Sequence, residues 1–246
     1  MRKMKNKKLK AILSITGYFL VIIAICVSAC FVFHSLYYEL IYVSGISMSP
    51  TLNGAENEQA GVIVDFGIMD THESALKNIK RFSIVSTYYP DDVDYDLSGK
   101  LKTGAKQKIK RIIALPGETF KIENSKLYVN NEYIPYTFVT NPKAEEGYTG
   151  KDTNGEITLA DNQYWVLGDN RANSRDSGAL NLAINKDNLI GVLVAIEGKA
   201  QLTVKNYICQ NCGKTQKGGS LCGNCGGTLS PDYDLINKQY SWPKYY

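Results

Sequence analysis

Three short stretches of this sequence hold the residue types that a covalent hydrolase uses. The first, GISMSPTL, places Ser47 in a turn-like segment directly after a long apolar region. The second, KIKRIIALPGE, places Lys110 and Arg111 within an apolar run, and the third, GDNRANSRDS, clusters polar and charged side chains. A serine hydroxyl attacks a carbonyl carbon when a neighbouring base removes its proton. Taken alone, Ser47 and Ser49 before Pro50 also fit an ordinary turn whose hydroxyls bond their own backbone.

The sequence favours a lysine over a histidine as that base. The two histidines are His34, in or next to the apolar region, and His72, in a polar stretch, and neither is well placed. Lys110 has apolar neighbours on both sides, and burial disfavours a charged ammonium. Lowering a lysine pKa by about 3 units from ~10.4 costs roughly 4 kcal/mol and leaves a base that works near neutral pH. The alternative is that Lys110 lies at the surface of an edge strand.

The element that must position these residues begins at the N-terminus. Residues 1–10 carry six cationic side chains and no acid, and the next 23 residues, 11–33, carry no charge. At 1.5 Å per residue this apolar run spans roughly 35 Å, enough to cross a bilayer. The basic flank predicts that the N-terminus stays in the cytoplasm and that the chain after residue 35 is extracytoplasmic. We therefore expect a single-pass plasma-membrane protein.

Two other interpretations of the apolar run remain open. A cleaved signal peptide usually has an apolar region of about 7–15 residues, which is shorter than this one. The stretch Val27–Cys30, VSAC, is similar to the lipobox of bacterial lipoproteins, so cleavage there would leave a lipidated Cys30. Cys26 and Cys30 also fit as apolar filler of the span.

The remainder of the chain has the pattern of a β domain. The 246 residues carry a net charge of +4, and without the six charges of the basic flank about −2 remains, which gives no indication of nucleic-acid binding. A short helix or surface turn is predicted for residues 70–80, and residues 136–157 are predicted as loop. The predicted strands are residues 37–44, 62–66, 81–89, 108–115, 118–123, 126–129, 163–167 and 189–197.

Together, the three stretches resemble those of the bacterial type I signal peptidases, membrane-anchored Ser/Lys proteases that remove signal peptides from exported proteins. The resemblance runs from the apolar span to about residue 197, in the same order and with similar spacing. It implies an antiparallel β-sheet catalytic domain after one transmembrane helix. The expected division is residues 1–35 for the flank and anchor, 36–205 for the peptidase domain and 206–246 for a small cysteine-containing tail.

The resemblance also implies roles for individual residues. Ser47 is expected to be the nucleophile and Lys110 its general base, with Ser174 orienting the lysine amine and no cofactor needed for catalysis. The Ser47 backbone N–H and the region of Gly45 are expected to bind the oxyanion. Gly45 stands where some members have a serine hydroxyl donor.

Further residues are expected to support this site and the substrate. Asp169 is expected to pair with Arg111, and Asp176 to help hold the turn. Shallow apolar pockets would admit small side chains and give a preference for Ala-X-Ala cleavage sites in the signal peptides of pre-proteins. The residues expected along the extended substrate are Ile41, Val43 and Ile109.

Two rival functions are compatible with the same sequence. One is a dedicated processing peptidase for a few substrates, such as pilin-like subunits. The other is a non-catalytic, membrane-tethered assembly protein on a degenerate peptidase scaffold. Because all three stretches are intact, the sequence favours catalysis.

The last region contains two CxxCG motifs outside the resemblance. Their cysteines, Cys209, Cys212, Cys222 and Cys225, have the spacing of a zinc ribbon with four thiolate ligands. Extracytoplasmic cysteines tend to oxidise, so two disulfides are the alternative. The aromatic-rich end, residues 230–246, is expected to rest on the domain or on lipid headgroups.

Overall fold

A computed structural model describes residues 2–55, 59–90, 94–96, 98–102, 105–136 and 152–246. The chain forms two compact units, Met1–Glu39 and Leu40–Tyr246. The predicted loop at residues 136–157 falls mostly outside the described residues.

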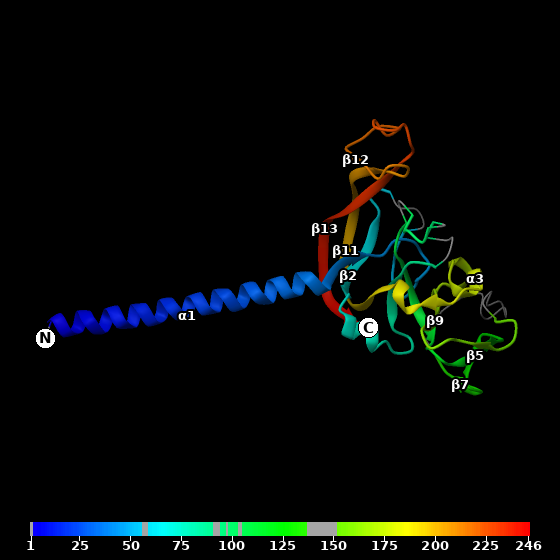
Figure 1. Cartoon of the computed structure of the whole chain (residues 1–246), viewed down its shortest axis with the longest axis horizontal. Helices are drawn as coiled ribbons and strands as arrows, with labels where there is room; N and C mark the ends of the chain where they lie inside the picture. Colours follow the sequence, from blue (N-terminus) through cyan, green and yellow to red (C-terminus); the bar gives the residue numbers. More distant parts are fainter. Residues whose placement is uncertain (1, 56–58, 91–93, 97, 103–104, 137–151) are drawn as a thin grey trace. The chain divides into compact units, whose positions relative to one another are not determined.

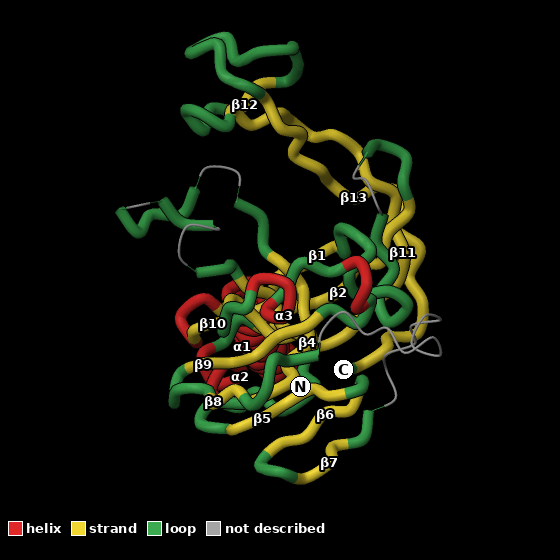
Figure 2. Tube along the Cα trace, turned by 90° about the vertical axis from the view of Figure 1, so that its right-hand side faces the viewer, coloured by secondary structure: helices red, strands yellow, loops and turns green. Residues whose placement is uncertain are grey.

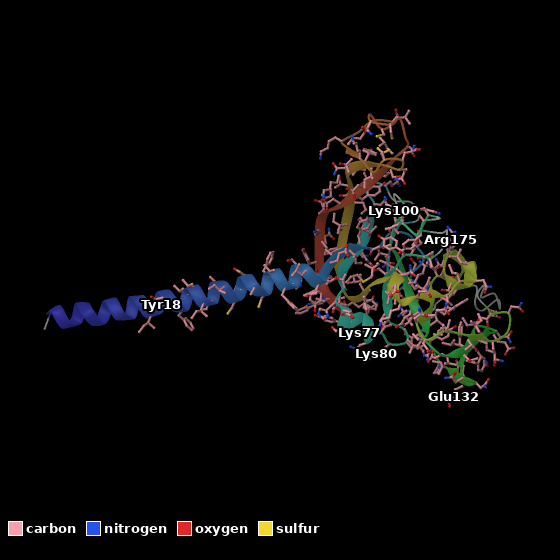
Figure 3. The ribbon with its side chains drawn as sticks, in the orientation of Figure 1. Tyr18, Lys77, Lys80, Lys100, Glu132 and Arg175 are labelled. Carbon is pink, nitrogen blue, oxygen red and sulfur yellow. The ribbon has the colours of Figure 1, made fainter. Side chains whose placement is uncertain are left out.

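The first unit is dominated by helix α1, Arg2–Tyr37 (Figure 1). Its segment Ile15–Tyr37 has a mean hydropathy of 2.5 and is the one helix of the described residues long and apolar enough to cross a membrane. Side chains such as that of Tyr18 point outward along it, and its apolar residues are exposed (Figure 3). A helix that is apolar on all sides needs an apolar environment such as lipid. The helix continues four residues beyond the predicted span, through Tyr37.

The second unit is built on a large antiparallel sheet. Its strand order is β1-β2-β11-β3-β4-β9-β10, with β12 and β13 also paired to β11. The central strand β11 is long enough to pair with β2, β3 and β13. These strands are β1 (Tyr38–Tyr42), β2 (Ile63–Asp70), β3 (Ile84–Thr87), β4 (Lys108–Ala114), β9 (Gln163–Leu167), β10 (Ile184–Asn185) and β11 (Leu189–Cys209).

A smaller sheet packs against β4 and β9 through a shared apolar core. Phe120 lies 5.3 Å from the Trp165 ring, and Ile113 and Leu167 belong to the same buried cluster. Asn124 and Ser125 both have positive φ, as the tight turns of β-hairpins require. Its strands, in the order β7-β6-β5-β8, are Glu132–Ile134, Lys126–Val129, Thr119–Glu123 and Ile157–Thr158.

Helices contribute little to the second unit. The described residues contain the short α2 (Glu73–Lys77), the single turn α3 (Ser177–Leu180) and the 3-10 turns Arg171–Asn173 and Lys186–Asn188. The predicted fold class, a mainly β domain after one apolar N-terminal helix, is therefore confirmed.

The cysteine region is the tip of a long hairpin. β13 (Leu229–Tyr245) returns along β11, from Cys209 opposite Leu229 to Ala195 opposite Tyr245, and the short β12 (Thr215–Gln216) lies at the tip. Figure 2 shows β11 and β13 running side by side into this tip. The predicted boundary near residue 205 falls inside β11, whose burial alternates beyond Gly198 to Leu202 and whose strand pairing continues to Cys209.

Candidate active site

Two buried apolar side chains anchor the loop that carries Ser47. Met48 and Leu52 are almost completely buried, and the Leu52 N–H donates a 3.0 Å hydrogen bond to the Met48 carbonyl. Both side chains join the apolar cluster between the loop and the sheet. Gly45, just before the loop, has a φ of 77°, a conformation that glycine adopts without strain. The spacing of apolar residues in the loop thus determines which side of it faces the sheet.

Lys110 reaches this loop from β4. It pairs with Val85 of the neighbouring β3, and only 4% of the residue is exposed. Its Nζ donates hydrogen bonds to Ser47 Oγ, at 2.8 Å, and to the Ile109 carbonyl, at 3.0 Å. A serine hydroxyl and a lysine amine 63 residues apart in sequence therefore lie in direct contact.

The residues predicted along the substrate path surround the same loop. Val43 belongs to the apolar cluster that contains Met48, and Ile41 and Ile109 are half-buried against it. Val43 itself is buried, and its backbone N–H donates a 2.8 Å hydrogen bond to the Asp65 carbonyl.

Gly168 lies where the third stretch closely approaches the first stretch, which carries Ser47. A Cβ built on it would lie 2.5 Å from the Ser47 carbonyl oxygen and 2.3 Å from Ser174 Oγ. The Gly168 N–H donates a 2.9 Å hydrogen bond to Asp176, which is fully buried and also caps α3 by accepting from the Ala179 N–H. Ser174 thus lies next to the Ser47 backbone. Asp176 holds Gly168, the residue that follows β9, in place.

Arg111 and Asp169 form a buried, two-pronged ion pair next to this site. Arg111 Nε and Nη2 lie 2.8 and 2.6 Å from the two Asp169 carboxylate oxygens, and Nη1 donates to the Phe82 carbonyl at 2.8 Å. Such bidentate contacts are geometrically specific and stronger than neutral hydrogen bonds. The pair ties the end of β9 to β4, the strand that carries Lys110.

Two residues with evident positioning contacts were not singled out from the sequence. Asn170 donates from its backbone N–H to the Ser47 carbonyl at 2.9 Å and from its side chain to the Ile46 carbonyl at 3.2 Å. Gly168 makes the close approach described above. Both lie in the GDNRANSRDS stretch, but a glycine and an amide have no distinctive reactivity, so only the contacts reveal their roles.

The four tail cysteines gather at the tip of the β11–β13 hairpin, outside this site. All four Sγ atoms lie within 4.8 Å of one another, and Cys209–Cys225 and Cys212–Cys222 are 3.4 and 3.7 Å apart with no disulfide. A tetrahedral site with Zn–S bonds of about 2.3 Å has sulfurs about 3.8 Å apart. The cluster therefore has the dimensions of a site that can bind a metal ion.

The backbone at the tip also fits metal-binding turns. The Gly213 N–H bonds the Cys209 carbonyl and the Gly226 N–H bonds the Cys222 carbonyl, so the two CxxCG turns have the same pattern. Gly213 and Gly226 both have positive φ, which explains the glycine after each motif. Backbone N–H groups, first that of Cys212, lower the pKa of the Cys209 thiol to about 6, whereas, although the Gly227 N–H acts to lower it, the pKa of its neighbour Cys225 is raised to about 12 by the adjacent thiols.

Comparison with known proteins places this arrangement in a family. The model of the family described as signal peptidase, peptidase S26, matches residues 15–197. The chain belongs to this family of serine peptidases. The three stretches and strands β1 to β10 lie within the matched residues, whereas the end of β11, the cysteine tip and β13 lie outside them.

Individual relatives agree with this assignment. Signal peptidase I from Bacillus amyloliquefaciens is 34% identical over 138 residues, covering 55% of this chain and 62% of the relative. Signal peptidase I U from Bacillus subtilis (strain 168) is 28% identical, covering 76% of this chain and 87% of the relative. Signal peptidase I V from the same organism is 33% identical, covering 61% and 80%. The chain thus spans slightly less than two thirds of the first of these relatives.

Among solved structures, a signal peptidase I from Enterococcus faecalis V583 is similar over 47% of the length of this chain and 97% of the length of the solved chain. It is 24% identical, with a TM-score of 0.35.

Proposed function

We propose that this chain is a membrane-anchored serine endopeptidase that removes signal peptides from exported pre-proteins. The observation that carries the proposal is the 2.8 Å hydrogen bond from Lys110 Nζ to Ser47 Oγ at a buried position. It joins a hydroxyl that can act as nucleophile to a base that requires no metal or histidine. Membership of the signal peptidase family supports the same reaction class.

In the proposed mechanism Ser47 and Lys110 act as a dyad. Burial disfavours the ammonium, so Lys110 is neutral in the active enzyme and takes the Ser47 proton as Oγ bonds to the scissile carbonyl carbon. The lysine ammonium then protonates the leaving amine as the C–N bond breaks. Water next attacks the ester, again with Lys110 as base, and releases the signal peptide carboxylate and the free serine.

Neighbouring groups hold this dyad in place. We propose that the Ser47 backbone N–H binds the oxyanion and that Ser174 orients the lysine amine. A Cβ built on Gly45 meets no atom within 4 Å, so the space beside it is open to a substrate. Asp169, Arg111 and Asp176 act indirectly by holding β4 and the end of β9.

The proposed substrate is an extended signal peptide with small residues at the Ala-X-Ala positions. The half-buried side chains of Ile41 and Ile109 next to the loop support binding of apolar side chains, with the buried Val43 packed in the cluster behind them. With Ile15–Tyr37 as anchor, the basic flank places the N-terminus in the cytoplasm and residues 36–205 outside the plasma membrane.

The test is cleavage of a pre-protein with an Ala-X-Ala site by the full chain in detergent. Ser47→Ala and Lys110→Ala should each reduce turnover at least about 10⁴-fold, because members of a catalytic unit are not additive. Ser49→Ala is the matched control: its hydroxyl makes only a 3.4 Å contact with the Leu52 carbonyl, so turnover should stay near wild type. Thermal unfolding confirms that each variant is folded.

The results also separate the rival functions. Turnover near wild type in either dyad variant refutes the mechanism, and a folded wild-type chain that cleaves no pre-protein supports the assembly role. Cleavage limited to pilin-like precursors within a panel of pre-proteins supports a dedicated processing peptidase.

For the tail we propose one structural Zn²⁺ bound by Cys209, Cys212, Cys222 and Cys225. The supporting observations are the sulfur cluster and the paired turns that end in glycine. The full chain should contain about one zinc by elemental analysis and four titratable tail thiols after denaturation in chelator. A preparation with two disulfides and no metal contradicts this proposal without affecting the peptidase proposal.

A further inference from the structure

The second half of β13 exposes large aromatic side chains. Tyr240, Trp242 and Tyr245, here called the aromatic strip, are 68%, 95% and 73% exposed. Single exposed apolar residues are ordinary, but three large aromatics within six residues of one edge strand form a patch that typically has a partner. Long, apolar edge strands are also aggregation-prone when nothing covers them.

The exposure of Trp242 is built into the strand. Ile196 pairs with Lys244 and Gly198 with Tyr240, so the three residues 241–243 lie opposite Glu197 alone. This wide irregularity turns Trp242 away from the sheet. The strand is not frayed beyond it, because Ala195 pairs with Tyr245 and the Tyr246 N–H bonds the Val194 carbonyl at 3.1 Å.

A close backbone approach fixes the next aromatic in the strip. Tyr240 packs edge-on against the buried Phe66 ring, with centroids 5.2 Å apart, across the position of Gly198. A Cβ on Gly198 would lie 2.1 Å from the Gln239 carbonyl oxygen, so no larger residue fits between the two strands there. One face of the Tyr240 ring is thus anchored while the rest of the side chain remains exposed.

The charged side chains around the strip indicate what kind of partner it contacts. Residues 236–246, INKQYSWPKYY, contain Lys238 and Lys244 and no acid. Lys238 lies 6.0 Å from the Phe66 ring centroid and Lys244 lies 5.2 Å from that of Tyr246, so both cations accompany aromatic rings. Tryptophan and tyrosine prefer the headgroup level of a bilayer, where lysines also meet anionic lipids.

The sheet keeps this strand close to the residues that follow α1. The Val43 N–H bonds the Asp65 carbonyl, and Asp65, Lys199 and Gln239 lie opposite one another on β2, β11 and β13. Three strand spacings of about 4.8 Å place Gln239 roughly 15 Å from Val43. Val43 follows the candidate span, which ends at Tyr37, by only six residues. The covalent link therefore keeps the aromatic strip within reach of a bilayer that α1 crosses.

We propose that the aromatic strip, with Lys238 and Lys244, is a second membrane contact that inserts at the headgroup level of an anionic bilayer. It lies outside the residues matched by the family and goes beyond the proposed peptidase activity. A lipid surface is favoured over a protein partner because residues 236–246 combine exposed rings with two lysines and contain no acidic side chain, and the acid on the paired strand, Glu197, is half-buried.

The chain offers a matched pair of fluorescence reporters, because it has two tryptophans. Trp242 is 95% exposed, whereas Trp165 is 3% exposed in the core. The variant Trp165→Phe leaves Trp242 as the sole reporter, and Trp242→Phe leaves Trp165 as the control. Both full-length variants are placed one copy per nanodisc, in phosphatidylglycerol/phosphatidylcholine containing lipids brominated near the headgroup end of the acyl chain.

The proposal predicts blue-shifted Trp242 emission that bromine reduces at least about twofold, while Trp165 emission is unchanged. Trp242 emission typical of indole in water, with no bromine quenching, overturns it. A blue shift that appears only after adding a pre-protein, or only in discs with two copies, also overturns it in favour of a protein partner.

Charge provides a second measurement. Bromine quenching of Trp242 should fall in discs of phosphatidylcholine alone and in the double variant Lys238→Gln/Lys244→Gln on anionic discs. Equal quenching in all three cases refutes the role of the two lysines. In hydrogen exchange, the Trp242→Tyr variant should keep the backbone amides of residues 236–245 protected in discs. The Trp242→Ser variant should reduce this protection. Equal protection of this segment in discs and in detergent refutes the contact.

Discussion

The tightest contact in the candidate active site leads to the sharpest mutational prediction, Gly168→Ala. The added Cβ would lie 2.5 Å from the Ser47 carbonyl oxygen, and ordinary contact begins at 3.4 Å. The backbone beneath the nucleophile must therefore move by about 0.9 Å, and Ser174, whose Cβ would lie 2.6 Å from the added Cβ, must move with it, because neither a carbonyl nor a Cβ can rotate away. The Asn170 N–H that bonds the same carbonyl would be displaced with it.

A misplacement of about 1 Å at reacting groups costs roughly 10²-fold in rate, equivalent to about 2.7 kcal/mol. We expect kcat/KM for a soluble Ala-X-Ala peptide to fall by this factor, mostly in kcat, because binding of the peptide is unchanged. The assay compares full chains in detergent, with thermal unfolding as the check on folding.

The matched control is Gly218→Ala. A Cβ built on Gly218 meets no atom within 4 Å and its φ is not positive, so its activity should equal that of wild type. If folded Gly168→Ala retains activity within about threefold of wild type, then the contact does not position Ser47, and the assigned geometry of the site is refuted.

Three further predictions concern the base, the buried ion pair and the tail. The proposed role of buried Lys110 as a neutral base predicts that the cleavage rate rises with pH and levels off well below ~10.4, and a rate still climbing steeply near pH 10 contradicts a buried base. Asp169→Ala leaves Arg111 buried without this carboxylate and should lower the free energy of unfolding by about 3–5 kcal/mol in denaturant titrations, whereas Glu73→Ala, which removes an exposed pair with Lys77, should leave it near the wild-type value. Chelation should expose residues 209–229 to proteolysis while cleavage of a soluble peptide continues, and loss of peptide cleavage would show that the tail is part of the catalytic unit.

The sequence was most informative where a local pattern has a single structural solution. The strand at residues 163–167 is predicted to the residue, and the turn at Asn124-Ser125 is recognisable because those residue types tolerate positive φ. The apolar helix follows from length and the absence of charge alone. These elements need no distant partner to be recognised.

The return of the chain along β11 was not predictable in the same way. β13 lacks a clear alternation in burial and is mostly exposed, so its sequence has no period-two pattern. Its strand conformation comes from backbone pairing with β11. From the sequence, the strand that begins at Leu189 is predicted only to residue 197. The predicted boundary at residue 205 reflects that missing signal.

The sequence by itself determined which chemical groups the site contains. Ser47, Lys110 and the four tail cysteines are identified by residue type and local spacing, since reactivity and metal preference belong to the side chains. Only the tertiary structure decided that Lys110 Nζ lies 2.8 Å from Ser47 Oγ and that Gly168 leaves room for the Ser47 carbonyl and Ser174. Those contacts depend on the pairing of strands that are far apart in the chain. Local sequence does not determine this pairing, because sheet register is fixed by burial over the whole domain.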